Sequence, residues 1–151
     1  LHGILHSFPT RRSSDPTLIV QVVMNLCTNS LQAMRPTGGD LWVSTRTIGV
    51  QDSLPGRGAA ARYVELTVED TGHGMDAETL DRIYEPFFTR REVGQGTGLG
   101  LSIVHGIVTS LRGTIQVQSG PGRGTVFHVL LASAANSIPQ QDSLDDVDYS
   151  R

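Results

Sequence analysis

Two glycine-rich turns constrain the fold of this chain more than any other feature. DTGHGM at residues 70–75 ends an alternating, strand-like stretch, and GTGLGLS at residues 96–102 leads into a helical pattern. Glycine lets other groups approach the backbone closely, and the free amides at a helix start bind anions well. The two turns therefore predict one pocket in which backbone groups hold a nucleotide, and the rest of the chain is expected to present that pocket.

Length and charge limit the classes of protein that the chain can represent. Its 151 residues suit one domain with a single core. The 12 Lys and Arg against 15 Asp and Glu give a net charge of -3, which provides no basic field for a nucleic-acid backbone. We therefore expect no nucleic-acid partner.

The cysteine count and the hydropathy of the chain bear on disulfides, metal sites and membrane contact. The single Cys27 excludes an internal disulfide, and without clustered Cys and His ligands a zinc site is not expected. No apolar run approaches the roughly 20 residues that cross a bilayer. We expect a cytoplasmic segment without direct membrane contact, whose parent protein can still be membrane-anchored.

The two ends of the chain differ in composition from its middle. Residues 1–14 show neither helical nor strand periodicity and resemble translated adaptor sequence, so we expect a leader that is foreign to the fold. From residue 132 the chain is acidic and poor in apolar side chains, which predicts a disordered acidic linker over 132–151. The folded domain is expected over residues 15–131.

The middle of the chain alternates between helical and strand patterns. Asp15 and Pro16 are typical of a helix start, and apolar residues spaced by threes and fours predict a helix to about Met34. Further elements are expected at 41–47 and 63–69 (strands), 76–83 and 98–111 (helices), and 114–118 with 124–131 (a hairpin). This pattern predicts an α+β fold, a sheet of four or more strands with helices on one face. The faces predicted to be buried carry Ile19, Val22, Val23, Leu26, Leu31 and Met34 in the first helix, and Leu99, Ile103, Val104, Ile107, Val108 and Leu111 in the helix over 98–111.

A polar stripe crosses the first predicted helix. Gln21, Asn25 and Asn29 are spaced by four residues, which places their carboxamides on one line of the helix surface. Asparagine is a mediocre helix former, so two of them one turn apart require a reason. They form either a hydrogen-bonded pair in the core or a polar wall that faces a ligand.

The two glycine-rich turns suit different parts of a nucleotide. The glycines of GTGLGLS precede a helix, whose amides and dipole favour phosphate, although the motif is neither a P-loop nor a GxGxxG fingerprint. Asp70 can accept a hydrogen bond from an exocyclic amine such as that of adenine, while Gly72 and Gly74 let the backbone approach a flat ring. For each motif taken alone, a flexible turn or a capping Asp is the alternative.

Five motifs follow one another in a fixed order: NLCTN, DTGHGM, EPFF, GTGLGLS and GRGTVF. They resemble the N, G1, F, G2 and final G boxes of the ATP-binding domain (HATPase, or GHKL) of bacterial two-component sensor histidine kinases. The resemblance covers about residues 15–131, and HGIV after the G2 box is most similar to hybrid or nitrogen-regulation-type kinases.

The resemblance implies the Bergerat fold, which gyrase, Hsp90-type and MutL-type ATPases share. This fold is a two-layer α/β sandwich with a mixed, mainly antiparallel sheet. The helix and strand that usually precede the N box are missing from this chain or replaced by residues 1–14, so we expect an exposed sheet edge and exposed apolar surface.

The resemblance also implies a role for each matched residue. Asn29 would ligate Mg²⁺, with phosphate oxygens and water as the other ligands. Asn25 occupies the position where ATP-hydrolysing relatives carry a glutamate as general base, so phosphoryl transfer to a partner is favoured over hydrolysis. Arg90 or Arg91 would reach the γ-phosphate. The other implied nucleotide contacts are Asp70, Gly72 and Gly74 at adenine, Gly96, Thr97, Gly98, Leu99 and Gly100 at the phosphates, Phe87 and Phe88 at the base of a lid, and Thr125 near the adenine edge.

These implications predict the Mg-ATP-binding catalytic domain of a sensor histidine kinase. It would donate the γ-phosphoryl group to a histidine of a dimerisation domain, but this chain has no HDxxN or HExxN motif. The phosphoacceptor domain is therefore expected elsewhere in a parent protein, homodimers would form only through it, and a response regulator or receiver domain would act downstream. The isolated fragment is expected to be inactive without that acceptor.

The sequence is also compatible with three other functions. They are a stand-alone Bergerat-fold ATPase, a nucleotide-sensing module and an anti-sigma-type serine kinase. The five histidines offer no strong catalytic candidate, and His73 in the first turn is expected to face solvent.

Overall fold

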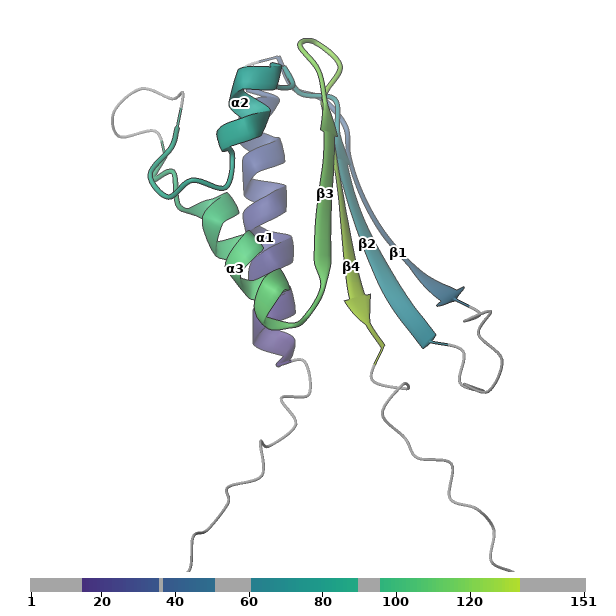
Figure 1. Ribbon diagram of the computed structural model, residues 1–151. Helices are drawn as coiled ribbons and strands as arrows, with labels where there is room; N and C mark the ends of the chain where they lie inside the picture. Colours follow the sequence, from purple (N-terminus) through teal and green to yellow (C-terminus); the bar gives the residue numbers. More distant parts are fainter. Residues whose placement is uncertain (1–14, 36, 51–60, 90–95, 134–151) are drawn as a thin grey trace, which may run out of the picture.

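The computed structural model describes residues 15–35, 37–50, 61–89 and 96–133 (Figure 1). The predicted leader, Arg90 and Arg91, and residues 134–151 of the linker predicted over 132–151 lie outside the described residues, whereas Ala132 ends β4. In chain order, the elements are α1 (Pro16–Ala33), β1 (Leu41–Val50), β2 (Ala61–Asp70), α2 (Ala77–Arg82), α3 (Gly100–Ser110), β3 (Thr114–Ser119) and β4 (Thr125–Ala132).

The helices begin and end close to their predicted limits. The Asp15 side chain accepts a hydrogen bond from the Thr17 amide at 2.9 Å and Pro16 occupies the first turn, so α1 starts where the sequence predicts. A cap of this kind stabilises a helix by about 1 kcal/mol. The Asp76 side chain caps α2 in the same way by accepting from the Thr79 amide at 2.8 Å. None of the described helices is long and apolar enough to span a membrane.

The described strands form one sheet in the order β1-β2-β4-β3, and every neighbouring pair is antiparallel. The expected mixed sheet is therefore purely antiparallel within the described ranges, because β4 inserts between β2 and β3. Asp70 at the end of β2 lies opposite Leu41 of β1 on one side and Thr125 of β4 on the other. The strand ends thus bring the first glycine turn beside GRGTVF.

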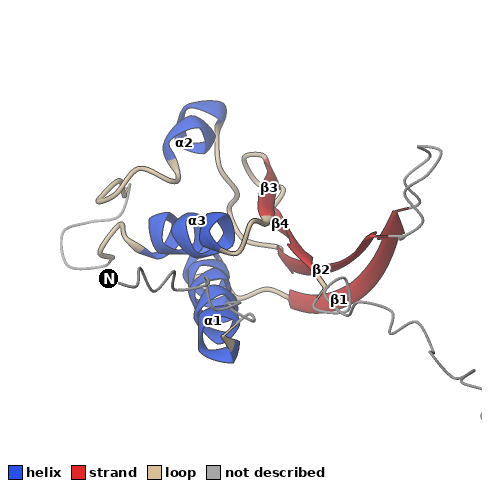
Figure 2. Cartoon of the chain, turned by 60° about the horizontal axis from the view of Figure 1, so that its bottom comes forward, coloured by secondary structure: helices blue, strands red, loops and turns tan. Residues whose placement is uncertain are grey.

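The helices lie on one face of the curved sheet, which confirms the α+β class (Figure 2). Their apolar side chains meet the alternate residues of β2 and β4 in one core. Burying an aliphatic side chain of this size stabilises the fold by about 1.5–3 kcal/mol. The fully buried aliphatic residues of this core are Val22 and Leu26 of α1, Val68 of β2, Val104 and Val108 of α3, and Val129 of β4.

The predicted buried face of α1 is wrong at one position. Leu31 is 54% exposed, whereas the neighbouring Ser30 is only 2% exposed. Neighbouring helical residues point about 100° apart, and the line that packs on the sheet runs through Val22, Leu26 and Ser30. In α3, Ile103 is likewise exposed rather than buried. Apolar spacing identified these helices but did not set which line of each faces the core.

The edge strand β1 leaves apolar side chains uncovered, as expected from the sequence. Val43 of β1 pairs with Val68 of β2, yet Val43 is 47% exposed while Val68 is fully buried. The helical layer therefore covers β2 but leaves β1 open on the same face. Trp42, on the other face of β1, is exposed as well.

Candidate functional site

A pocket of about 590 Å³ lies where α1, α3, the end of β2 and the start of β4 meet. Its volume falls in the range of small-molecule sites, about 300–1,000 Å³. Residues from all five motifs line it. They are Asn25 and Asn29 from NLCTN, Asp70 and Gly74 from DTGHGM, Phe88 from EPFF, Gly96, Thr97, Gly98 and Gly100 from GTGLGLS, and Thr125 from GRGTVF.

The polar stripe of α1 forms one wall of this pocket beside the start of α3. A Cβ atom placed on Gly100 would lie 3.4 Å from Asn25 Oδ1 and 3.5 Å from Asn29 Nδ2. Asn29 Nδ2 is buried and has no hydrogen-bond partner among the described residues. A buried donor without a partner costs about 1–3 kcal/mol. The hydrogen-bonded core pair is thus not what the structure shows, and a ligand with acceptor oxygens fits this wall.

Asp70 lies at the end of β2 and is almost fully buried. Its Oδ1 accepts a hydrogen bond from the Gly72 amide at 2.9 Å, so one oxygen stabilises the turn as a capping Asp does. A carboxylate has about four acceptor positions, and Asp70 also lines the pocket. The geometry of Asp70 is therefore compatible both with capping the turn and with accepting a hydrogen bond from an exocyclic amine.

A hydroxyl network fixes Thr125 beside Asp70. Ser119 Oγ accepts from the Met75 amide at 2.9 Å and donates to the Gly124 carbonyl at 2.8 Å. Because a serine hydroxyl has a single hydrogen, Thr125 Oγ1, which lies 3.0 Å from Ser119 Oγ, must be the donor of that pair. The lone pairs of Thr125 Oγ1 remain as acceptors in the buried wall of the pocket.

Two glycines hold the turns in conformations that other residues rarely adopt. Gly74 has φ +66°, and a Cβ on it would collide with the Gly120 carbonyl oxygen. Gly98 also has φ +66°, and a Cβ on it would lie 2.6 Å from the Phe87 carbonyl carbon. Left-handed backbone favours glycine. Both residues are therefore required where the glycine turns pack against neighbouring backbone.

Three predicted site residues do not line the pocket, namely Gly72, Phe87 and Leu99. Gly72 packs on the C-terminal end of α1, where its added Cβ would lie 2.8 Å from Ala33 Cβ. Phe87 is 74% exposed, although its amide donates to the Gly98 carbonyl at 2.9 Å. Arg90 and Arg91 cannot be placed, because both lie outside the described residues.

The pocket also contains residues that the sequence alone did not single out. Gln32 lies three residues after Asn29 and extends the polar stripe, and its Oε1 is buried without a partner in the described part of the chain. Helical spacing was the signal that could have identified it. The other additions include Thr28, Met75, Ile83, Leu101 and Phe127.

His73 is exposed, as expected, but it lies at the pocket. Its Nδ1 is 2.6 Å from the Gly74 carbonyl oxygen. A carbonyl only accepts, so Nδ1 carries the hydrogen. Cys27 does not line the pocket, and burial raises the pKa of its thiol, which disfavours a nucleophilic role.

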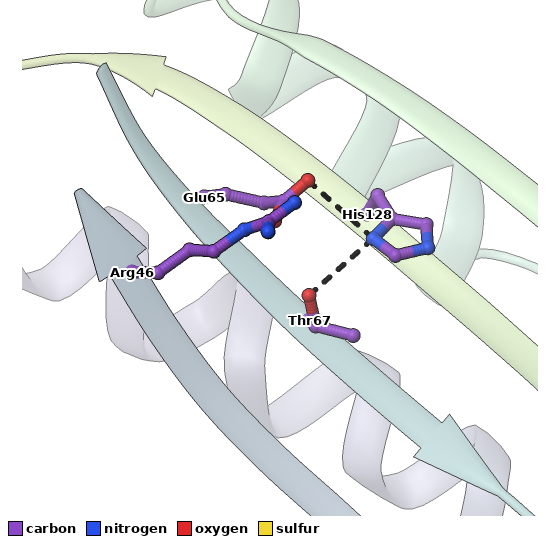
Figure 3. A network of polar contacts seen from close by, with 4 residues as sticks. All are labelled: Arg46, Glu65, Thr67 and His128. Atoms are coloured by element: carbon purple, nitrogen blue, oxygen red, sulfur yellow. Dashed lines mark hydrogen bonds and ion pairs between the residues drawn. The ribbon is translucent and has the colours of Figure 1, made fainter. Parts of the chain in front are cut away.

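The opposite face of the sheet carries a separate polar cluster (Figure 3). We call Arg46, Glu65, Thr67 and His128 the outer network. Glu65 pairs with Arg46, and its Oε1 lies 3.5 Å from His128 Nδ1, which is also 3.3 Å from Thr67 Oγ1. The hydrogen bond from Arg46 lowers the pKa of Glu65. None of the four residues lines the pocket, so the outer network stabilises the surface of the sheet and takes no part in the site.

Comparisons with known proteins agree with this geometry. The family of histidine kinase-, DNA gyrase B- and HSP90-like ATPases matches residues 14–135. The sensor kinase CckA of Brucella abortus (strain 2308) is 46% identical over 118 residues, which are 74% of this chain and 12% of that protein. This chain spans only 12–22% of the lengths of the first three curated relatives that it matches.

Two solved structures have a fold similar to that of this chain. The mycobacterial sensor histidine kinase MprB has a TM-score of 0.61 and 25% identity, covering 78% of this chain and 72% of that one. Full-length ShkA in complex with AMPPNP has a TM-score of 0.55 and 26% identity, covering 81% of this chain and 23% of that one.

Proposed function

Since the chain belongs to the family of histidine kinase-, DNA gyrase B- and HSP90-like ATPases, we propose that its pocket binds Mg²⁺·ATP and presents the γ-phosphoryl group to a histidine of a separate dimerisation domain. The observation that carries the proposal is the convergence of five sequence-distant motifs on one pocket with a polar α1 wall. ShkA, a protein of similar fold, is solved in complex with AMPPNP, which supports a nucleotide as the ligand.

The base binds at the Asp70 wall in this proposal. The carboxylate of Asp70 accepts a hydrogen bond from the exocyclic amine of adenine. Thr125 offers an acceptor beside it, because its own hydrogen is directed to Ser119. Ile83 and Phe127 are buried apolar side chains of the lining and would contact the flat faces of the ring.

The phosphates bind between α1 and the start of α3. The amides of the glycine turn and the helix dipole stabilise negative charge there. Asn29 fits this end, because its buried Nδ2 needs an acceptor and its Oδ1 is the hard oxygen ligand that Mg²⁺ prefers. When bound, Mg²⁺ neutralises charge on the phosphate oxygens. We assign Gly96, Thr97, Gly98 and Gly100 to phosphate contact, and Arg90 or Arg91 remains our candidate for the γ-phosphate.

Asn25 distinguishes transfer from hydrolysis. Its side chain lies at the same wall as Asn29, but a carboxamide cannot take a proton from water at neutral pH. General-base activation of water is therefore absent at this position. Phosphoryl transfer depends mainly on positioning and charge neutralisation, which favours a partner side chain as the acceptor.

The relatives support a proposal about the partner and the setting. Two of these relatives are named sensor kinases and a third is named sporulation kinase E, and this chain matches only a small part of each. We propose that the parent protein supplies the histidine-bearing dimerisation domain, that homodimers form through it, and that a response regulator or receiver domain accepts the phosphoryl group next. The domain itself, over residues 15–131, would lie in the cytoplasm.

A labelling experiment tests the proposal. The purified chain is mixed with a separately produced phosphoacceptor domain of the parent kinase, Mg²⁺ and ATP labelled at the γ-position. We expect label on the acceptor domain and none on a version with its histidine replaced by glutamine. Intact ATP binding without labelling would contradict the transfer, and steady phosphate release without the acceptor would instead support a stand-alone ATPase.

A further inference from the structure

A cation packs on an aromatic side chain at the rim of the pocket. Arg82 is the last residue of α2, and its Cζ lies 4.3 Å from the centroid of the Phe88 ring. This distance is well inside the limit of about 6 Å for a cation–π contact. Phe88 lines the pocket, but Arg82 does not. Arg82 therefore reaches the pocket wall through the Phe88 ring on which it packs.

Glu85 holds Arg82 in this orientation. Its Oε2 accepts from Arg82 Nε at 3.0 Å and lies 2.9 Å from the second guanidinium nitrogen. Both side chains are about half exposed, so the ion pair by itself adds little stability. The backbone also links Glu85 to Phe88, because the Phe88 amide donates a hydrogen bond to the Glu85 carbonyl at 3.2 Å.

The adjacent residue connects this turn to the glycine turn before α3. The Phe87 amide donates to the Gly98 carbonyl at 2.9 Å. Phe87 has φ 66°, a conformation that a bulky residue adopts only when its surroundings enforce it. Gly98 thus holds the backbone at Phe87, and Arg82 packs on the side chain of the next residue, Phe88.

We infer that Arg82 and Glu85 form a positioning pair that holds the Phe88 ring against the nucleotide pocket and keeps the EPFF turn in register with Gly98. Neither residue contacts the ligand. The inference rests on the proposed nucleotide-binding function, because the pair would act on affinity through the shape of that pocket.

The test compares Arg82→Gln with Arg46→Gln in the full 151-residue chain. Arg46 also pairs with a glutamate, but it belongs to the outer network, none of whose residues lines the pocket. Calorimetric titration with Mg²⁺·ATP measures Kd. We expect Arg82→Gln to raise Kd about three- to tenfold, the combined size of an exposed cation–π contact and ion pair, and Arg46→Gln to leave it unchanged. Arg82→Lys should recover part of the loss, because it retains a cation without the guanidinium fork.

Amide hydrogen exchange without nucleotide provides a second, independent readout. Arg82→Gln should speed exchange at the Phe87 and Phe88 amides, while Arg46→Gln should not. Unchanged exchange and Kd in Arg82→Gln would overturn the positioning pair. So would an equal Kd loss in Arg82→Gln and Arg82→Lys accompanied by a lower melting temperature, because that pattern indicates general destabilisation. A wild-type chain that binds no ATP would contradict the proposed function, whereas the exchange result would still decide the role of the pair.

Discussion

The two faces of the sheet differ in how their polar groups are paired. On the outer face, Arg46, Glu65, Thr67 and His128 contact one another across three strands (Figure 3). On the helix side, Asn29 Nδ2 and Gln32 Oε1 are buried at the pocket without partners in the described ranges. Native proteins rarely leave buried polar atoms unpaired. Asn29 and Gln32 both line the pocket proposed to bind the nucleotide, whereas the more conspicuous ionic cluster lies away from it.

The largest expected effect is that of Asn29→Ala on Mg²⁺-dependent ATP binding. The variant loses a carboxamide that faces charged ligand groups, and a bond of that kind corresponds to about a hundredfold in affinity. Calorimetric titration with and without Mg²⁺ measures the loss. Because Asn29 Nδ2 has no partner in the described structure and Ala is the better helix former, the melting temperature of the free protein should not fall.

Thr67→Ala is the matched control in the outer network, where the lost group has a partner in His128. It should lower the melting temperature slightly and leave Kd for ATP at the wild-type value. Suppose instead that Asn29→Ala destabilised the free protein more than Thr67→Ala and still bound ATP normally. That result would contradict the assignment of Asn29 to binding and of the outer network to stability.

Gly98→Ala tests the backbone of the pocket face. With φ +66° and a Cβ that would meet Phe87 backbone atoms, we expect a loss of about 2 kcal/mol in the free energy of unfolding, measured by urea denaturation. Gly106→Ala in the middle of α3 is the control, because nothing lies within 4 Å of its added Cβ. That variant should be stabilised by about 0.5–1 kcal/mol. Equal effects at the two glycines would contradict the packing described here.

Asp70→Asn sharpens the assignment of the base wall. The Asn side chain can still accept from the Gly72 amide, but its NH₂ group would then face the exocyclic amine of adenine. We expect about tenfold weaker ATP binding and less discrimination between ATP and GTP, both measured by parallel titrations. Unchanged preference for ATP would place base recognition elsewhere in the pocket.

The smallest effect concerns the outer network at acid pH. The hydrogen bond from Arg46 lowers the folded-state pKa of Glu65 below the ordinary value of a glutamate. The stabilisation is therefore fully present above the unfolded-state pKa and is lost as pH falls through the lower folded-state value. Melting temperatures from pH 7 to pH 3 should show a shallower acid decline in Glu65→Gln than in the wild type, with ATP binding at neutral pH unchanged.

Glu69→Gln, on the same face of β2, is the control for that series. Glu69 does not belong to the outer network, so its acid decline should match the wild type. An identical decline in all three proteins would mean that the Arg46 pair contributes nothing measurable to stability.

Local chemistry made much of the site predictable from the sequence. Asp15 and Asp76 cap the helices that they were predicted to start or flank. The spacing of Asn25 and Asn29 placed both on one wall. The glycine turns line the pocket with the positive φ of Gly74 and Gly98, a backbone region that glycine adopts most readily. Each of these features depends on a few neighbouring residues, which a sequence displays directly.

Packing between distant segments decided the rest. Leu31 is exposed and Ser30 is buried because the sheet selects which line of α1 is covered. Gly72 packs on Ala33 and does not line the pocket. Phe87 and Phe88 are identical neighbours in the chain, yet one points outward and the other lines the pocket. The motifs of the sequence by themselves predicted a nucleotide pocket. Only the tertiary structure decided which of two equal side chains lines it, because the contacts with Gly98 and Arg82 are made by residues outside the EPFF motif.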